Sequence, residues 1–267
     1  MNNSKLILIL ISLIILVYFG IYGFLQSIKE EQGNIFKSQK LPADFKYSLN
    51  SNFEELNFPS KNGGLLNSLL FRVDHSKGVI CFWKGNGGTL KNWGEIAPHF
   101  LKLNYDIFIT DYRQHGKSQG SISLENFYSD AQTVYDALKK RYPENKIVIT
   151  GYSLGGRIAA HLAASNLPRL TILIDAASTT GDFSERFFEA MYYPLPLTNN
   201  FLFQTETDIR KAKSPVVIIA TENPNSLSHQ LKPLRQNKGT FFQIKGATHE
   251  TILTHNTTAK IIAKVLK

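Results

Sequence analysis

The chain has 267 residues, of which 43% are hydrophobic and 19% are charged, and it contains one cysteine. This length suits one sizeable domain, and a single cysteine excludes both an internal disulfide framework and a cysteine-based metal cluster. The net charge of +9 favours solubility and weak attraction to anionic surfaces, but no basic stripe interleaved with aromatic residues indicates nucleic-acid binding.

The first element in chain order is an apolar run without a charge, LILILISLIILVYFGIYGFL, from Leu6 to Leu25. About twenty residues of helix cross the hydrocarbon core of a bilayer. A buried core helix is disfavoured because nothing amphipathic breaks the run. A cleaved signal peptide is disfavoured because no small-x-small cleavage pattern is present. We therefore predict an uncleaved membrane anchor over residues 1–28.

The charges that flank this run give its orientation. Lys5 and the α-amino group precede it, and the sequence Lys29-Glu30-Glu31 follows it. Because positive charge favours the cytoplasmic side, we expect a single-pass protein with the bulk of the chain on the non-cytoplasmic side. Residues 29–52 are polar and have no hydrophobic pattern, which predicts a linker between the anchor and a domain of residues 53–267.

Strand-like patterns follow the linker, and several are continuously apolar and β-branched, as strands buried on both faces of a parallel sheet should be. The predicted strands are 53–58, 66–73, 78–83, 105–110, 146–150, 170–174, 215–220 and 240–244. The first two have no helix between them, which predicts an antiparallel hairpin at one edge of the sheet. Cys81 lies in the apolar run VICFW, where we expect a buried and inert thiol.

Helical patterns alternate with these strands. The predicted helices are 92–102, 124–141, 154–165, 227–237 and 250–266. The alternation predicts an α/β fold with a mostly parallel central sheet flanked by helices. It lapses between residues 176 and 213, a stretch rich in Phe, Tyr and Pro. Long aromatic connections are often functional, so we predict a lid-like insertion there, with a peripheral helix packed on the core as the alternative.

A candidate nucleophile lies between a predicted strand and the helix after it. The sequence IVITGYSLGG places Ser153 at the centre of a G-x-S-x-G motif. In such a motif the chain turns sharply from strand into helix, which projects the serine hydroxyl above the sheet. The N-terminus of the following helix favours developing negative charge. We predict that Ser153 is a catalytic nucleophile.

A serine nucleophile needs a base, and in this architecture the histidine follows the last strand. His249 has that position, in the sequence FFQIKGATHET. His255 is a second candidate, but the helical pattern places it one to two turns into the last helix. We therefore predict that His249 is the general base.

The stretch CFWKGNGGT follows the third predicted strand and is rich in glycine. In this architecture, backbone amides at that turn, together with the amide after the nucleophile, stabilise an oxyanion. We predict Asn86 and Leu154 as the backbone donors of an oxyanion hole. The alternative is a glycine-rich turn without function; a phosphate-binding loop is excluded because no G-K-[ST] sequence follows.

Four motifs in this order, KGNGG, DYRQHGKSQG, GYSLGG and GATHE, resemble the α/β-hydrolase superfamily over roughly residues 65–265. The chain looks most like the membrane-anchored α/β-hydrolase-domain proteins grouped with serine aminopeptidases and monoacylglycerol lipases. The resemblance implies the α/β-hydrolase fold, an N-terminal transmembrane helix, and the roles given above to Ser153, His249, Asn86 and Leu154. Lys84 departs from the pattern, because a histidine is typical at that position.

The catalytic acid is the second departure. In the family the loop after the strand equivalent to VVIIA usually reads G-T-x-D, and ATEN places Asn223 where that aspartate belongs. An asparagine can orient an imidazole but cannot stabilise the imidazolium by charge. Three assignments stay open. We favour Glu222, whose longer arm tolerates a shifted loop; Asp175, at the end of the strand TILID, is the second; and loss of the acid is the third.

These observations predict a membrane-tethered serine hydrolase that cleaves ester bonds of an apolar or lipid-derived substrate through an acyl-serine intermediate. We expect no metal, no organic cofactor and no nucleic acid; the expected partners are a small-molecule ester or lipid substrate and, through the N-terminal helix, the membrane. Two alternatives remain. A non-catalytic protein with this fold, serving binding or scaffolding, is favoured by Lys84 and Asn223; a serine peptidase or amidase would use the same residues.

Overall fold

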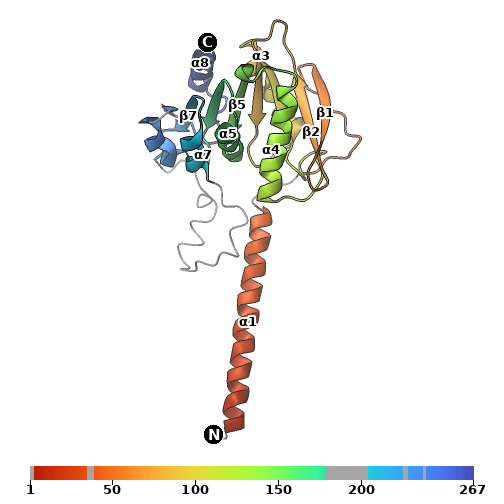
Figure 1. Cartoon of the computed structure of the whole chain (residues 1–267), viewed down its shortest axis with the longest axis vertical. Helices are drawn as coiled ribbons and strands as arrows, with labels where there is room; N and C mark the ends of the chain where they lie inside the picture. Colours follow the sequence, from red (N-terminus) through yellow and green to blue (C-terminus); the bar gives the residue numbers. More distant parts are fainter. Residues whose placement is uncertain (1–2, 35–38, 178–203, 225–227, 237–238) are drawn as a thin grey trace.

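The computed structural model describes residues 3–34, 39–177, 204–224, 228–236 and 239–267. Its centre is an eight-stranded sheet with the order β1-β2-β4-β3-β5-β6-β7-β8 (Figure 1). The strands are β1 (Phe53–Ser60), β2 (Gly64–Phe71), β3 (Val79–Trp83), β4 (Asp106–Thr110), β5 (Ile147–Tyr152), β6 (Leu170–Ile174), β7 (Val216–Thr221) and β8 (Gly239–Ile244). β1 and β2 form an antiparallel hairpin at one edge, β2 pairs antiparallel with β4, and all later pairs are parallel.

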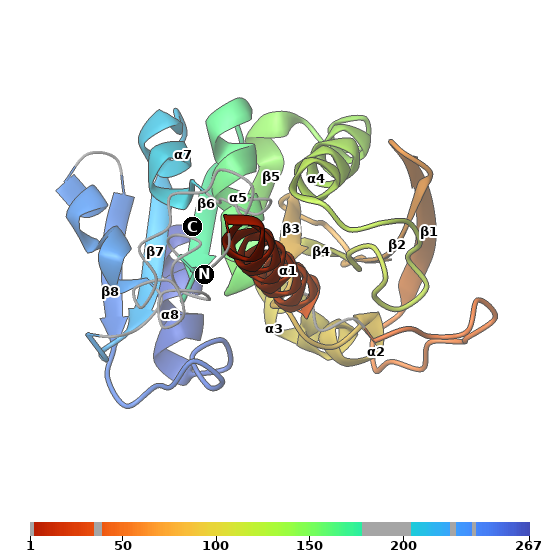
Figure 2. The same cartoon turned by 90° about the horizontal axis from the view of Figure 1, so that it is seen from below.

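Helices cover both faces of this sheet (Figure 2). The α-helices of the domain are α2 (Leu90–Trp93), α3 (Ala97–Leu101), α4 (Leu124–Lys139), α5 (Leu154–Ser165), α7 (Thr205–Lys211) and α8 (Asn256–Val265). Short 3-10 helices are η1 (Gly94–Ile96), η2 (Glu144–Lys146) and η4 (His229–Gln236). In Figure 2, α4, α5 and α7 lie on one face and α2, α3 and α8 on the other.

Two apolar clusters, one on each face of the sheet, make up the core. Side chains of α4, α5, α7 and η4 form one cluster with one set of strand side chains, and those of α2, α3 and α8 form the other. Every residue of β3, β5 and β6 is buried. Because strands covered on both faces have no solvent-facing side chains, their sequences are continuously apolar rather than alternating.

The predicted fold class is confirmed: the sheet is mostly parallel, flanked by helices, and carries the antiparallel hairpin at its edge. Each predicted strand overlaps an observed one, with boundaries within two residues. The predicted helices 124–141 and 154–165 correspond to α4 and α5. Ser123 caps α4 by accepting a hydrogen bond from the Asn126 amide at 3.1 Å, as the sequence pattern indicates.

Three helix predictions are corrected. The predicted helix 92–102 is divided into α2, η1 and α3, and Pro98, which has no amide hydrogen to donate to the preceding turn, lies at the start of α3. The predicted helix 227–237 is the 3-10 helix η4, which contains Pro233. The last helix, α8, begins at Asn256 rather than at residue 250. His255 is therefore not inside the helix but caps it, accepting a hydrogen bond from the Thr257 amide at 3.2 Å.

The N-terminal helix α1 (Asn3–Asn34) projects from the domain (Figure 1). Its segment Ser4–Gly23 has a mean hydropathy of 2.7, is 20 residues long and is 0% buried, so it is long and apolar enough to cross a membrane. The helix continues past residue 28, the predicted end of the anchor. Most of the predicted insertion, residues 178–203, lies outside the described residues; its C-terminal part contains α7, which packs on α5.

The segment between α1 and β1 contacts the domain. The Leu41 amide donates to the Gly116 carbonyl at 2.9 Å, and the Gly116 amide donates to the Gln39 carbonyl at 2.8 Å. Further along, the Lys117 ammonium donates to the carbonyl of Phe45 at 3.0 Å. Because Gly116 belongs to the loop after β4, these bonds attach the chain that follows α1 to the C-terminal edge of the parallel strands.

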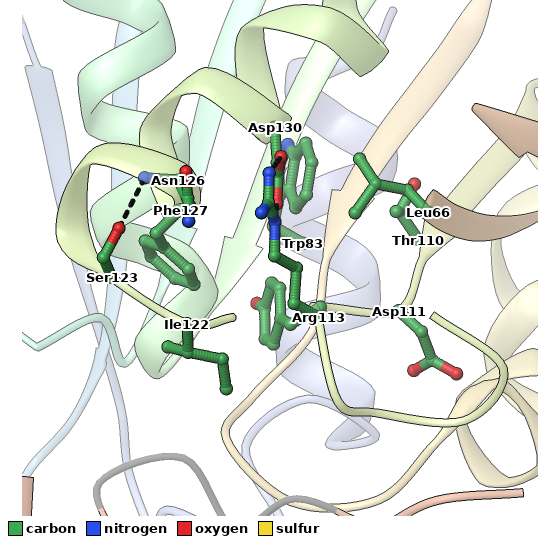
Figure 3. Close-up of a pocket in the computed structure, with 11 residues that line it drawn as sticks. Leu66, Trp83, Thr110, Asp111, Arg113, Ile122, Ser123, Asn126, Phe127 and Asp130 are labelled. Carbon is green, nitrogen blue, oxygen red and sulfur yellow. Dashed lines mark hydrogen bonds and ion pairs between the residues drawn. The ribbon is translucent and has the colours of Figure 1, made fainter. Parts of the chain in front are cut away.

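A buried ion pair joins the same loop to α4. Arg113 donates two parallel hydrogen bonds to Asp130, Nε to Oδ2 and Nη2 to Oδ1, both at 2.7 Å. Figure 3 shows Arg113 reaching Asp130 beside a pocket between this loop and the start of α4. The two side chains are only 2% and 9% exposed.

We expect the replacement Asp130→Ala to lower the free energy of unfolding by about 3–5 kcal/mol, because it leaves the Arg113 guanidinium buried without its carboxylate. The measurement is urea denaturation followed by circular dichroism. A matched control is Asp136→Ala on the same helix, since Asp136 pairs with Lys139 in an exposed position. That change should cost about 0.5 kcal/mol or less. Equal effects of the two variants would contradict the importance of the buried pair.

Candidate active site

The candidate catalytic residues lie at the C-terminal edge of the parallel strands. Ser153 follows β5, Asp175 follows β6, and the glycine-rich turn 85–88 follows β3. His249 lies between β8 and α8. In open α/β sheets the loops at the carboxyl ends of neighbouring strands meet at one edge, and ligands bind there. Segments that are far apart in the sequence therefore contribute to one site.

Ser153 lies in a strained turn between β5 and α5. Its backbone has φ 53° and ψ −118°, a conformation that a residue with a side chain rarely adopts. The surrounding structure holds this turn in place: the Ser153 amide donates to the Ile174 carbonyl at 3.1 Å, and the Gly156 amide donates to the Ser153 carbonyl at 3.0 Å. The turn projects the hydroxyl from the edge of the sheet, as the G-x-S-x-G motif predicts.

Close backbone contacts explain the glycines on both sides of the serine. A Cβ atom on Gly151 would overlap the carbonyl oxygen of Gly155. A Cβ atom on Gly155 would overlap the carbonyl oxygen of Trp83 in β3. Both neighbours are main-chain atoms that cannot rotate away, so the turn can pack against β3 only if these positions are glycine.

Ser153, His249 and Asp175 form a continuous hydrogen-bonded chain. His249 Nε2 lies 3.1 Å from Ser153 Oγ, and His249 Nδ1 lies 2.7 Å from Asp175 Oδ2. The Asp175 side chain is 1% exposed, whereas the His249 side chain is 34% exposed. This is the order nucleophile, base and orienting acid that activates a serine.

The structure thus brings Asp175, not Glu222, to His249, and this corrects the favoured assignment of the acid. Asp175 follows β6, which is the direct neighbour of β5 in the sheet. Its backbone adopts a positive φ of 40°, and its amide donates to the Ile219 carbonyl at 2.7 Å. These features bring the carboxylate within hydrogen-bonding distance of His249 Nδ1 without a contribution from the loop after β7.

Glu222 has a different contact. Its side chain is exposed, and Oε1 accepts a hydrogen bond from the Gly246 amide at 3.0 Å. Asn223, the residue that aligns with the family's aspartate, is also exposed. The carboxylate in the loop after β7 therefore supports the backbone of the turn before His249, whereas the imidazole itself pairs with Asp175.

Tyr152 is a site residue that the sequence pattern does not single out. Its ring stacks on the His249 imidazole with centroids 5.1 Å apart and an angle of 22° between the planes. Its hydroxyl donates to the His249 carbonyl at 2.6 Å. Burial raises the pKa of Tyr152 to about 12, so the phenol stays protonated and keeps this bond. Its position directly before the nucleophile is the only signal in the sequence.

The two predicted oxyanion donors lie on separate elements. Leu154 is the first residue of α5, so its amide is among those that have no partner within the helix. Asn86 is half-buried in the turn after β3. Hydrogen bonds on both sides of Asn86 hold this turn: the Tyr112 hydroxyl donates to the Lys84 carbonyl, and Trp93 Nε1 donates to the Gly87 carbonyl at 2.8 Å.

No metal-binding arrangement is found in the part of the chain that the structure describes: nowhere in it do three or more His, Cys, Asp or Glu side chains group around a place for a metal ion. Cys81, predicted to be an inert thiol, is buried in β3. Burial raises its pKa to about 12, which disfavours the reactive thiolate.

Comparisons with known proteins show what parts of this chain are similar to. Residues 78–176 match the family described as alpha/beta hydrolase fold. Protein bem46 of Schizosaccharomyces pombe is 28% identical over 183 residues, which cover 65% of this chain and 61% of that protein. The lysophosphatidylserine lipase ABHD12 of Danio rerio is 27% identical over 173 residues, covering 57% of this chain and 45% of that protein.

Solved structures show the same fold. The esterase Pf2001 of Pyrococcus furiosus superposes with a TM-score of 0.66 at 15% identity, covering 86% of this chain and 96% of that one. At this identity the likeness shows the fold alone. The chain spans about three fifths of bem46 and less than half of the lipase ABHD12, so the activities of these relatives do not transfer to it directly.

Proposed function

We propose that this chain, in which residues 78–176 match the family described as alpha/beta hydrolase fold, is a serine hydrolase that cleaves ester bonds of apolar, lipid-derived substrates. The observation that carries this proposal is the hydrogen-bonded chain from Ser153 through His249 to Asp175, with distances of 3.1 Å and 2.7 Å. The fold does not need this set of hydrogen bonds at a partly exposed sheet edge, whereas nucleophilic catalysis by a serine does need it.

The proposed reaction proceeds in two halves. Ser153 Oγ attacks the ester carbonyl carbon while His249 Nε2 takes the hydroxyl proton, and the amides of Asn86 and Leu154 stabilise the resulting oxyanion. His249 then gives this proton to the departing alcohol oxygen, and the carbon–oxygen bond breaks to leave an acyl-serine. A water molecule, deprotonated by His249, attacks the acyl carbon, and the acid leaves as Ser153 Oγ recovers the proton.

Asp175 acts on the imidazole rather than on the substrate. Its carboxylate accepts the Nδ1 hydrogen bond, which selects the tautomer with an unprotonated Nε2 facing the serine. The same negative charge stabilises the imidazolium that forms after proton transfer. An enzyme that uses Asp175 in this way needs no carboxylate at position 223, so Asn223 does not count against catalysis.

We further propose that α1 anchors the enzyme in a membrane, with the domain on the non-cytoplasmic side. The apolar segment Ser4–Gly23 supports the anchor. The bonds of Gln39 and Leu41 to Gly116 attach the chain to the edge of the sheet that carries Ser153. A fully extended chain covers only about 3.5 Å per residue, so the end of α1 at Asn34 lies within a short reach of this edge. That arrangement favours a substrate drawn from the membrane.

Ester turnover by the purified full-length chain in detergent micelles tests this function. We expect hydrolysis of p-nitrophenyl butyrate and of monoacylglycerols, and complete inhibition by an alkyl fluorophosphonate, which phosphonylates activated serines. Hydrolysis of peptide amides at a comparable kcat/KM would instead favour a peptidase. If none of these substrates were hydrolysed faster than in buffer alone, the hydrolase proposal would be contradicted and a non-catalytic binding protein would be favoured.

A further inference from the structure

We propose that Lys84 is a positioning residue that holds the oxyanion turn, defined as residues 85–88, in the geometry needed for ester hydrolysis. This inference rests on the proposed function and deepens it. It concerns the position at which the chain departs from its family, where a histidine is typical.

The Lys84 side chain is completely buried, and its ammonium group lies close to two hydrogen-bonding partners and one carboxylate oxygen. Nζ lies 3.0 Å from the Gly88 carbonyl oxygen, 3.0 Å from His115 Nδ1 and 3.5 Å from Asp111 Oδ1. A lysine ammonium has three donors and no acceptor, so the surroundings match its protonated form.

The hydrogen bond from Lys84 to the Gly88 carbonyl is one of three that hold carbonyl groups in and next to the oxyanion turn. The Tyr112 hydroxyl donates to the Lys84 carbonyl, and Trp93 Nε1 donates to the Gly87 carbonyl. The Lys84 ammonium donates to the Gly88 carbonyl. Because the C=O and N–H of a trans peptide point in opposite directions, these bonds fix the directions of the Gly85, Gly88 and Thr89 amides. The two ends of the turn are thereby held, and the Asn86 amide, the proposed oxyanion donor, lies between them.

The charges around Lys84 keep it protonated at neutral pH. Burial lowers the pKa of Lys84 to about 8, and the nearby Asp111 carboxylate opposes this shift. Burial raises the pKa of Asp111 to about 6, so lysine and aspartate are both charged between these values. The remaining groups that face Nζ are His115, whose pKa burial lowers to about 3, and the Tyr112 ring at 4.6 Å. Neutral His115 accepts from Nζ at Nδ1 in the tautomer that carries its proton on Nε2; in the other tautomer Nδ1 donates to the Gly88 carbonyl, 3.3 Å away.

Kinetics of the full-length chain test this inference. The replacement Lys84→Met alone would leave Asp111 buried without a counter-charge. The decisive variant therefore combines Lys84→Met with Asp111→Asn, because the introduced amide oxygen can still accept from the Leu90 amide. We expect a thermal transition like that of the wild type, kcat lower by about 10–100-fold, and KM within about threefold, because a loosened turn weakens transition-state stabilisation more than substrate binding.

The pH profile separates positioning from a purely structural role. In the wild type, kcat should decline above pH 8, where Lys84 loses its proton, and the double variant should lack this decline. The matched control is Lys117→Met: Lys117 also donates to a carbonyl near this loop, that of Phe45, but not to the oxyanion turn. Its kcat should equal that of the wild type.

Two results would overturn the inference. A folded double variant with wild-type kcat and an unchanged alkaline limb would show that Lys84 does not position the turn. Absence of ester turnover in the wild type and in Lys117→Met would refute the proposed function itself, and the role of Lys84 would fall with it. The wild-type rate therefore distinguishes failure of the inference from failure of the function.

Discussion

The replacement Asp175→Asn should lower kcat for ester hydrolysis by about 10³–10⁴-fold while the protein stays folded. Asparagine has nearly the same shape as aspartate, but it cannot neutralise the imidazolium that forms when His249 takes the serine proton. Its amide group can also donate to Nδ1, which selects the wrong tautomer of the imidazole. The measurement is kcat for p-nitrophenyl butyrate, with circular dichroism to establish that the fold is retained.

Glu222→Gln is the matched control for this variant. The glutamine oxygen can still accept the hydrogen bond that Glu222 Oε1 now accepts from the Gly246 amide. We therefore expect kcat within about threefold of the wild type, since a neutral acceptor preserves most of a hydrogen bond at an exposed site. A loss of about a thousandfold in Glu222→Gln, with Asp175→Asn near wild type, would restore Glu222 as the acid and contradict the structure's pairing.

The replacement Ser153→Ala should reduce kcat by about 10⁶-fold, to the level that binding and the oxyanion hole alone provide. The methyl side chain removes the nucleophile and with it the acyl-enzyme, so no burst of alcohol release should remain. Stopped-flow measurement of the burst and of the steady-state rate gives both quantities. A variant that still turned over at more than one tenth of the wild-type rate would exclude Ser153 as the nucleophile.

Much of this architecture can be predicted from local sequence, because its causes are local. Strands buried on both faces must be continuously apolar and β-branched, which is why the sequence alone locates β3, β5 and β6. Ser153 can be identified because the turn that carries it requires glycines at fixed spacing. His249 can be identified because its position after the last strand follows from the topology.

The identity of the acid could not be predicted in the same way. Whether a carboxylate reaches His249 depends on where two loops lie in space. Asp175 directly follows β6 and Glu222 directly follows β7, so both lie at the same edge of the sheet. The Thr that aligns ATEN with the family pattern favours the loop after β7. The adjacency of β5 and β6 in the sheet, visible only in the strand order, favours Asp175 instead.

The network around Lys84 also depends on tertiary contacts. A lysine in the sequence KGNGG gives no sign that its ammonium group is buried, because lysines are almost always exposed. Its partners Asp111 and His115 come from the loop after β4, and that loop lies beside the turn after β3 because β3 and β4 are parallel neighbours. The DYRQHGKSQG motif is a specific family signature, but its electrostatic role becomes clear only from the distances.

The most direct test of the account is to locate the adduct of a fluorophosphonate by peptide mass spectrometry. After the full-length chain has been treated with an alkyl fluorophosphonate, we predict a single modified peptide, with the phosphonate on Ser153. The same reagent should modify Asp175→Asn far more slowly and Ser153→Ala not at all. Adduct on another residue, or full ester turnover with Ser153 unmodified by the reagent, would contradict the assignment of Ser153 as the nucleophile.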